Sequence, residues 1–212
     1  MQVVYPGECV MGWSGADRVQ AVQHLKCQDQ VLRGVIERVG PLRLKSAGKG
    51  YSVLVQSIIS QQISTAAAAT IGQRLRLLVA GGELTAEAVA ELSDEQLKAV
   101  GISPQKLSYL RDLTRCTLEG VISFRRISRA SDEAAIEELI QVRGIGRWTA
   151  QMYLIFSLGR PDVFAPDDLG LRNAMQRLYG LGEKAGRPEL ERLAERWRPW
   201  RSAASWYLWR SL

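Results

Sequence analysis

Apolar residues along this chain recur at spacings of three and four positions, which is the repeat of one face of a helix. Ile136, Leu139 and Ile140 form one such face, and Trp148 and Met152 begin another a few residues later. No segment shows the two-residue alternation of a half-buried strand. The sequence therefore predicts an all-α protein of about ten helices.

Capping residues, prolines and glycines divide this pattern into segments. The predicted helical segments are residues 17–39 as one or two helices, 51–59, 64–80, a short helix opened by the capping box of Ser93 and Gln96, 103–120, a pair within 131–158, 167–180, and two last helices that open at Pro188 and Pro199. We expect residues 41–49 to form a polar connection. Asp167 is the expected N-cap of the helix that ends near Gly180.

The helix pair within 131–158 is joined by a tight turn with the sequence Gly144-Ile145-Gly146. A Gly-x-Gly turn between helices is common, and by itself it indicates only a connection. The triplet does not fit a dinucleotide-binding loop, because no strand precedes it and no third glycine follows. Glycines at the start of the second helix let a phosphate approach the backbone N–H groups, and Arg143 and Arg147 flank the turn. The combination favours a nucleic-acid backbone as the ligand.

Two carboxylates, Asp167 and Asp168, stand at the start of a predicted helix. The simplest interpretation is that both cap the helix, but one of them suffices for that. Adjacent helical residues point about 100° apart, so the two cannot act as the facing carboxylates of an ordinary glycosidase. A single aspartate held ionised by a helix N-terminus suits another task, the stabilisation of an oxocarbenium-like sugar. That chemistry needs a base that departs easily, as a cationic alkylpurine does.

Tryptophans are concentrated in the second half of the chain. They are Trp148, Trp197, Trp200, Trp206 and Trp209, with a sixth at Trp13. Most of them are expected to pack in the core, while a few of the five are suited to stack on an extruded, positively charged base. The polar segment Ser60–Ser64 interrupts two apolar helices. It is either a plain connecting turn or the source of a side chain that fills the gap left by a flipped nucleotide.

Composition narrows the class of protein only slightly. The chain has 212 residues, a formal charge of +6 and a pI near 9.5, which suits a polyanionic partner without proving one. Cys9, Cys27 and Cys116 are odd in number and far apart, so they fit neither a disulfide framework nor a metal site and favour a reducing intracellular compartment. We expect no signal peptide and no membrane span.

Four ordered motifs together resemble the helix-hairpin-helix superfamily of DNA glycosylases, and within it the alkylbase branch of 3-methyladenine DNA glycosylase II. The matching segments are Ser57–Ser64, Arg143–Ala150, Asp162–Asp168 and Glu195–Ser202. The resemblance covers residues 17–212. It implies two helical lobes that contain a helix-hairpin-helix motif and have the active cleft between them. The expected layout is residues 1–49 packing with the C-terminal lobe, 50–158 as the central lobe, and 159–212 as the C-terminal lobe with the catalytic aspartate.

The resemblance also implies roles for individual residues. Asp168 is the catalytic carboxylate, and Trp148 and Trp209 line the base pocket. Met152 stands where some members place an aromatic residue of that pocket, and Gln62 occupies the position of the wedge in the duplex. The residues expected to bind the DNA backbone are Arg143, Gly144, Gly146, Arg147 and Thr149. A monovalent cation, Na⁺ or K⁺, is expected on the backbone carbonyls of Ile140, Val142 and Gly144, and no other cofactor is required.

Departures from the family pattern carry information. Bifunctional relatives have a lysine where this chain has Trp148, and that lysine forms a Schiff base that leads to strand cleavage. With tryptophan there, we expect a monofunctional enzyme without lyase activity. Relatives with an iron–sulfur cluster carry a four-cysteine C-terminal segment, which the residues up to Leu212 do not contain, so we expect no iron–sulfur cluster. We likewise expect no counterpart of the β-rich N-terminal domain of some members.

The sequence thus leads to one favoured hypothesis and its rivals. The favoured one is a monomeric, monofunctional glycosylase that removes 3-methyladenine and related alkylated purines from double-stranded DNA and so starts base excision repair, in the cytoplasm at the nucleoid or in a eukaryotic nucleus. The first rival is a glycosylase for uracil, deaminated purines or another damaged base. The second is a helix-hairpin-helix DNA-binding module without catalysis, in which Asp168 is merely a cap.

Overall fold

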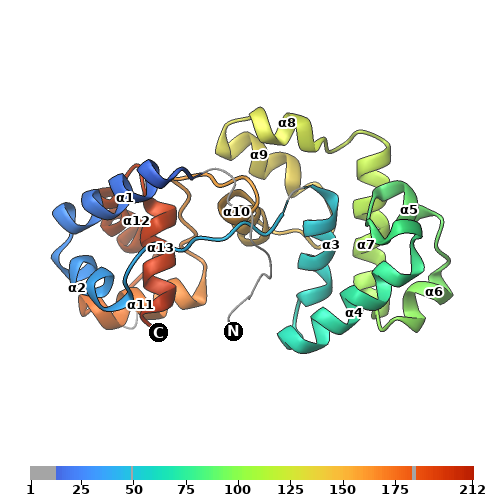
Figure 1. Cartoon of the computed structure of the whole chain (residues 1–212), viewed down its shortest axis with the longest axis horizontal. Coiled ribbons are helices and arrows are strands. Elements are labelled where there is room, and N and C mark those ends of the chain that lie inside the picture. Colours follow the sequence, from blue (N-terminus) through green and yellow to red (C-terminus); the bar gives the residue numbers. More distant parts are fainter. Residues whose placement is uncertain (1–12, 49, 183–184) are drawn as a thin grey trace. The chain divides into compact units, whose positions relative to one another are not determined.

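A computed structural model describes residues 13–48, 50–182 and 185–212 of the chain. The described residues are helical and contain no strand, which confirms the predicted all-α class (Figure 1). The helices divide between two compact units. We call the described residues up to Ser46 together with Leu154–Leu212 the terminal unit, and Ala47–Tyr153 the central unit.

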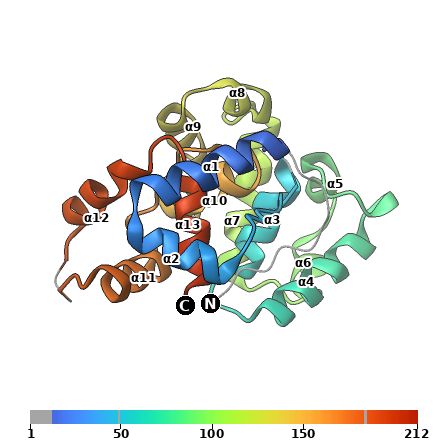
Figure 2. The ribbon, with the colours of Figure 1, turned by 60° about the vertical axis from the view of Figure 1, so that its left-hand side comes forward.

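The terminal unit is built from helices at both ends of the chain (Figure 2). They are α1 (Gly15–Gln28), α2 (Gln30–Val39), α11 (Leu169–Tyr179), α12 (Arg187–Ala194), the short 3₁₀ turn η2 (Glu195–Trp197) and α13 (Arg201–Arg210). Asp29 ties them together, because its carboxylate caps α2 and also accepts hydrogen bonds from Tyr179 Oη and Trp197 Nε1, each at 2.8 Å. Buried polar groups need such partners, and here one carboxylate accepts from two backbone N–H groups of α2 and from two side chains of distant segments.

The central unit surrounds a long amphipathic helix, α7 (Pro104–Leu118), which buries Leu107, Leu110 and Leu113. Around it lie α3 (Tyr51–Ser60), α4 (Thr65–Leu78), the 3₁₀ turn η1 (Ala80–Gly82), α5 (Ala86–Ala90) and α6 (Asp94–Ala99). Further along the chain, α8 (Phe124–Arg129) and α9 (Asp132–Leu139) lie side by side (Figures 1 and 2). A salt bridge of 2.7 Å between Arg126 and Glu138 holds these two together.

Helix α10 (Arg147–Phe156) has residues in both units, since the central unit ends at Tyr153 and the terminal unit resumes at Leu154. Nearly every side chain from Ala150 to Ile155 is buried. Such all-round burial explains why the apolar pattern is so continuous over this stretch of the sequence.

Most predicted helix starts are confirmed by capping hydrogen bonds. Ser64, Ser93, Ser103 and Ser131 each accept the backbone N–H three residues on, and Ser93 and Gln96 form the expected capping box. Gly180 ends α11 in the left-handed conformation, at a φ of 63°.

Three details of the prediction were wrong. Asp167 does not cap α11, because Asp168 does. Pro199 does not open the last helix, which begins at Arg201. The described part of this segment, residues 41–48, is irregular but not simply polar, since Leu42 and Leu44 are buried at about 5% exposure or less. Cys9 and the expectation for the first residues lie outside the described residues.

In the part of the chain that the structure describes, no helix combines the length and the apolar character needed to cross a membrane.

Candidate functional site

The carboxylate of Asp168 is the N-cap of α11 and is held in a nearly buried position. Its Oδ1 accepts the backbone N–H of Leu171 at 2.7 Å, and the side chain is 9% exposed. Backbone φ and ψ of −70° and 120° keep Asp168 just outside the helix, so its side chain can turn back over the first turn. The carboxylate thus lies at the helix N-terminus, where the backbone carries a partial positive charge.

A second donor reaches the same oxygen from the last helix. Trp209 Nε1 donates to Asp168 Oδ1 at 2.8 Å, across 41 residues of sequence. The indole is stacked on Phe156, with ring centres 5.7 Å apart and planes inclined by 29°. The structure therefore places the predicted catalytic residue Asp168 against one predicted pocket residue, Trp209, and orients the carboxylate through two converging N–H groups.

Gly170 makes this approach sterically possible. A Cβ atom at position 170 would lie 3.1 Å from Asp168 Oδ1 and 3.2 Å from Trp209 Cδ1. Both distances are tighter than ordinary van der Waals contact, so any side chain here would push the indole and the carboxylate apart. Sequence reasoning did not single out Gly170, since a glycine in the first turn of a helix carries no pattern that signals a close approach.

Asp167 points elsewhere. Its carboxylate lies 3.7 Å from the guanidinium of Arg187, and its side chain is 56% exposed. Exposed ion pairs of this kind contribute little to stability. Of the two adjacent carboxylates, only Asp168 is built into a buried hydrogen-bonding arrangement.

The Gly-x-Gly turn between α9 and α10 forms the predicted hairpin. Ile145 N–H donates to Val142 O at 3.0 Å, which closes the turn. Gly144 has a φ of +83°, and a Cβ there would come within 2.3 Å of the Tyr109 ring. Gly144 is therefore required by both backbone conformation and packing inside the protein.

Gly146 has a different role from Gly144. A Cβ at position 146 would meet nothing within 4 Å, so the fold does not demand a glycine there. Gly146 precedes the first residue of α10 and offers no side chain to cap the helix. The first N–H groups of a helix have no carbonyl acceptor within it, and such an end is suited to a phosphate.

The predicted backbone-binding side chains lie in unequal environments. Arg143 is exposed, with its guanidinium 6.0 Å from the centre of the Tyr109 ring, and its backbone N–H donates to Asp112 Oδ2 at 2.7 Å. Arg147 forms a two-pronged ion pair with Glu133, at 2.6 and 2.5 Å. Thr149 is half-buried in the first turn of α10.

The polar turn between α3 and α4 is fixed to this hairpin. Gln61 Nε2 donates to the Gly144 carbonyl at 2.9 Å, across 83 residues of sequence. The next residue, Gln62, is exposed and has a φ of +58°, the left-handed region that residues other than glycine rarely adopt. Such backbone strain, of about 1 kcal/mol or more, persists only where the surroundings enforce it and is concentrated at functional sites.

The two remaining predicted pocket residues lie on α10. Trp148 is 41% exposed, while Met152 is buried at 8%. Together with Phe156 they repeat at intervals of four residues, so they follow one face of the helix. That face leads from Trp148 to Phe156, on which Trp209 is stacked.

Two of the three carbonyls expected to bind a cation already accept a hydrogen bond. Val142 O accepts from Ile145 N–H, and Gly144 O accepts from the Gln61 amide. Each carbonyl oxygen has two lone pairs, so one hydrogen bond leaves it able to bind a hard cation. No group of three His, Cys, Asp or Glu side chains with metal-binding geometry occurs in the described part of the chain.

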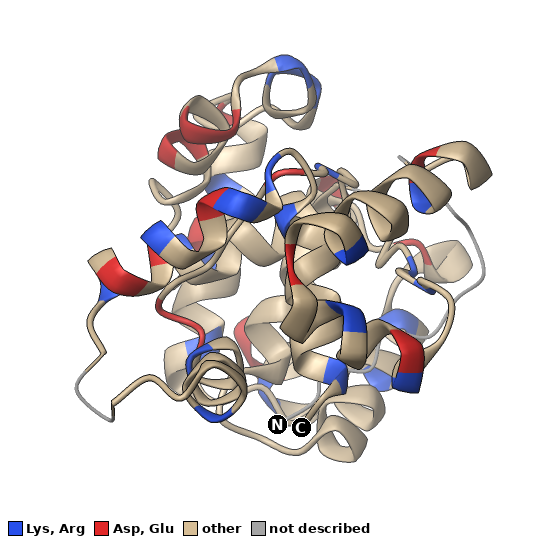
Figure 3. Ribbon diagram, turned by 90° about the vertical axis from the view of Figure 1, so that its left-hand side faces the viewer, with Lys and Arg blue, Asp and Glu red and all other residues tan. Residues whose placement is uncertain are grey.

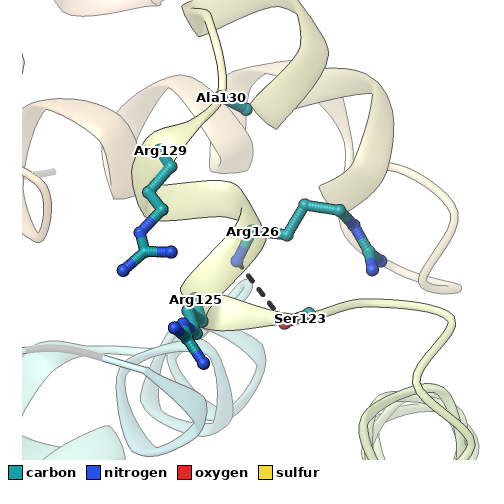
Figure 4. Close-up of a pocket in the computed structure, with 5 residues that line it drawn as sticks. All are labelled: Ser123, Arg125, Arg126, Arg129 and Ala130. Atoms are coloured by element: carbon teal, nitrogen blue, oxygen red, sulfur yellow. Dashed lines mark hydrogen bonds between the residues drawn. The ribbon is translucent and has the colours of Figure 1, made fainter.

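Positive charge accumulates on α8, beside α9 of the hairpin. A hollow of about 440 Å³ on this helix is lined by Ser123, Arg125, Arg126, Arg129 and Ala130. Arg125 and Arg129 project to the same side of the helix, whereas Arg126 turns away from them (Figure 4). Elsewhere basic and acidic positions are interspersed along the ribbon (Figure 3). The surface of α8 therefore suits a polyanion.

The fold is all-helical and contains a Gly-x-Gly hairpin and a nearly buried aspartate that caps a helix. These features point to a class of DNA repair protein. The chain belongs to the HhH-GPD superfamily of base excision DNA repair proteins, whose family model matches residues 55–199. The matched residues include the turn that carries Gln62, the hairpin and Asp168.

Particular relatives share most of the chain. DNA-3-methyladenine glycosylase 1 of Schizosaccharomyces pombe is 34% identical over 193 residues, which are 89% of this chain and 85% of the relative. The structure of a DNA-3-methyladenine glycosidase from Bacillus halodurans superposes with a TM-score of 0.83 at 36% identity, covering 90% of this chain and 88% of the other. The Schizosaccharomyces pombe 3-methyladenine DNA glycosylase Mag1, in complex with abasic DNA, gives a TM-score of 0.80 at 34% identity, with coverages of 91% and 96%.

Proposed function

We propose that this protein is a monofunctional DNA glycosylase that hydrolyses the N-glycosidic bond of alkylated purines, such as 3-methyladenine, in duplex DNA. The observation that carries the proposal is the carboxylate of Asp168, fixed by Leu171 N–H and Trp209 Nε1. The family and the names of the relatives support the substrate class. The reaction is the first step of base excision repair, so the protein acts where the genome is kept.

The chemistry follows from the charge of the substrate. The bond between the sugar C1′ and the base nitrogen breaks, and its electron pair leaves with the purine, which becomes neutral. The sugar is left with oxocarbenium character, which the negative charge of Asp168 stabilises. Water then bonds to C1′ and releases a proton to solvent, and an abasic site remains. One carboxylate suffices because a base that is already cationic needs no protonation to depart.

We propose that Trp148, Met152 and Trp209 receive the extruded base. Indole faces attract cations, and an alkylated purine carries its positive charge over a flat ring. Extrusion costs a few kcal/mol, and least for a damaged, poorly paired base. Since position 148 is a tryptophan rather than a lysine, there is no amine here to form a Schiff base, and the strand stays uncut.

We propose that the hairpin binds the DNA backbone through the N–H groups that follow Gly144 and Gly146, with Arg143, Arg147 and Thr149 alongside. Gly146→Asp tests this assignment. Because a Cβ at position 146 enters open space and aspartate is a good N-cap, the melting temperature should not fall. The new negative charge should weaken binding to any duplex by about tenfold or more. Unchanged duplex affinity would contradict the hairpin assignment.

We also propose a monovalent cation on the carbonyls of Ile140, Val142 and Gly144, as a structural element of the hairpin. The cation would tie the turn together and would take no part in bond breaking. Melting temperatures in Na⁺, K⁺ and tetramethylammonium at equal ionic strength test it. Stabilisation by Na⁺ or K⁺ above the level in tetramethylammonium supports the cation, and equal melting temperatures in the three salts would contradict it.

Product analysis tests the proposed function directly. The protein is incubated with DNA methylated by an alkylating agent, and free bases and alkali-labile abasic sites are measured. Release of 3-methyladenine with uncut strands is the expected result. Borohydride should trap no covalent adduct, and a panel of single-lesion duplexes ranks alkylated purines against uracil and hypoxanthine. DNA binding without release of any base would instead support a non-catalytic binding module.

A further inference from the structure

The turn that carries Gln62 and the hairpin that carries Gly144 are joined by direct bonds within the central unit. We name residues 61–64, between α3 and α4, the wedge turn. The side-chain amide of Gln61 donates to the carbonyl of Gly144 at 2.9 Å. The hydrogen bond thus links a turn near the start of the central unit's sequence to a hairpin near the end of that sequence.

Helix α7 contacts both the end of α3, next to the wedge turn, and the hairpin. Lys106 Nζ donates to Ile59 O at 2.7 Å, which satisfies a carbonyl of the last turn of α3, just before the wedge turn. One turn further, the Tyr109 ring fills the space that a side chain at Gly144 would need. Asp112 Oδ2, a turn beyond, accepts the Arg143 N–H at 2.7 Å. Residues at positions 106, 109 and 112 of one helix thereby contact first the end of α3, next to the wedge turn, and then the hairpin.

Hydrogen bonds also hold the end of α3 that leads into the wedge turn. Ser60 Oγ donates to Gln56 O at 2.7 Å, so the end of α3 is closed internally as well. Gln62 is nevertheless exposed and held in the left-handed conformation, with a φ of +58°. A side chain that is exposed while its backbone is held in a rarely adopted conformation is preorganised for a contact outside the protein.

We propose that Gln61 is a positioning residue that couples the wedge turn to the hairpin. It ensures that Gln62 enters the gap of a distorted duplex at a fixed position relative to the gripped phosphates. The proposal rests on the proposed function insofar as Gln62 is the wedge. It assigns to Gln61 a task separate from contact with DNA, because its amide is directed at a protein carbonyl.

The test compares two duplexes that differ only in the need for a wedge. One is undamaged, and the other carries a tetrahydrofuran abasic site, whose gap the wedge fills. Gln61→Met removes the N–H donor while keeping the length of the side chain. Gln73→Met, at an exposed position of α4, is the matched control, and Gln62→Ala shows the full effect of losing the wedge.

The expected result is a selective loss. Gln61→Met should lower the preference for the abasic duplex by about three- to tenfold, which is the usual effect of one neutral hydrogen bond, and should leave affinity for undamaged DNA within about twofold. In the Gln61→Met/Gln62→Ala double variant the two losses should not multiply, because both act through the same contact. The control should behave as the wild type.

Two outcomes would overturn the coupling. One is an unchanged preference for the abasic duplex in Gln61→Met, and the other is a full multiplication of losses in the double variant. If Gln61→Met lowers the melting temperature strongly, Gln61→Glu serves as the second variant, since it keeps the size and reverses the donor into an acceptor. Base release by the wild type is measured separately, so failure of the glycosylase proposal and failure of the coupling are distinguishable.

Discussion

The hydrogen bond between Trp209 and Asp168 provides the sharpest prediction about catalysis. Trp209→Phe removes the Nε1–H donor but keeps an aromatic ring that can stack on Phe156. The carboxylate then loses one of the two N–H donors described at Oδ1, so its orientation is less firmly fixed. A hydrogen bond to a charged group contributes about 1.5–3 kcal/mol.

Two effects of this change oppose one another. Without the indole the carboxylate keeps more of its negative charge for the sugar cation, but its position is less defined. At an effective dielectric constant of about 20, the attraction between unit charges is about 4 kcal/mol at 4 Å and about 3.3 kcal/mol at 5 Å. A displacement of about 1 Å thus costs about 0.8 kcal/mol, and we expect this cost together with the disorder of the side chain to exceed the gain in charge. We expect a net loss of about 1 kcal/mol, or about fivefold.

Two abasic analogues isolate this effect. A pyrrolidine nucleotide is cationic and mimics the charged sugar, whereas a tetrahydrofuran nucleotide has the same shape without charge. Neither carries a base, so the stacking of Trp209 on a base does not contribute. Trp209→Phe should weaken binding to the pyrrolidine duplex by about fivefold and leave the tetrahydrofuran duplex unchanged. Trp206→Phe, on the same helix, is the matched control.

The reasoning would be refuted by an equal loss for both analogues, which would indicate that Trp209 is only a packing residue. It would also be refuted if Trp209→Phe bound the cationic analogue as tightly as the wild type. In that case the Trp209 N–H would not be needed to hold the carboxylate in place.

Two glycine substitutions give further predictions. Gly170→Ala should raise helix stability by up to about 1 kcal/mol yet slow base release at least severalfold, because its Cβ crowds both Asp168 Oδ1 and the Trp209 ring; unchanged single-turnover rates would contradict this. Gly144→Ala should destabilise the fold by about 3 kcal/mol or more, since it requires a left-handed alanine and collides with Tyr109; a urea-unfolding midpoint equal to that of the wild type would disprove the steric argument.

Much of the fold was accessible from the sequence because it depends on local signals. The serine caps at 64, 93, 103 and 131 and the glycine at 180 are short-range patterns with a direct physical meaning, and the structure confirms them. The short helices α5 and α8 were missed, since five or six residues show too few turns for a periodic pattern.

The error at Asp167 has a similarly local cause. Either of two adjacent aspartates can be written as the cap of the following helix, and the pattern is the same for both. Tertiary contacts distinguish the two, because the Trp209 indole donates to Asp168 while Asp167 faces Arg187.

The support of the candidate site was not predictable from spacing. Gln61 reaches Gly144 across 83 residues and Trp209 reaches Asp168 across 41. Neither pairing leaves a periodic trace in the sequence. The resemblance to a family named the residues expected to touch DNA, but the residues that hold those in place became apparent only from their contacts.

The central claim is that one fixed carboxylate enables loss of a cationic base, and Asp168→Asn tests it most directly. Asparagine keeps the shape of the cap and removes the charge. Single-turnover release of 3-methyladenine should fall by about a hundredfold or more, while affinity for a tetrahydrofuran duplex remains close to that of the wild type. Base release at the wild-type rate by Asp168→Asn would contradict the account.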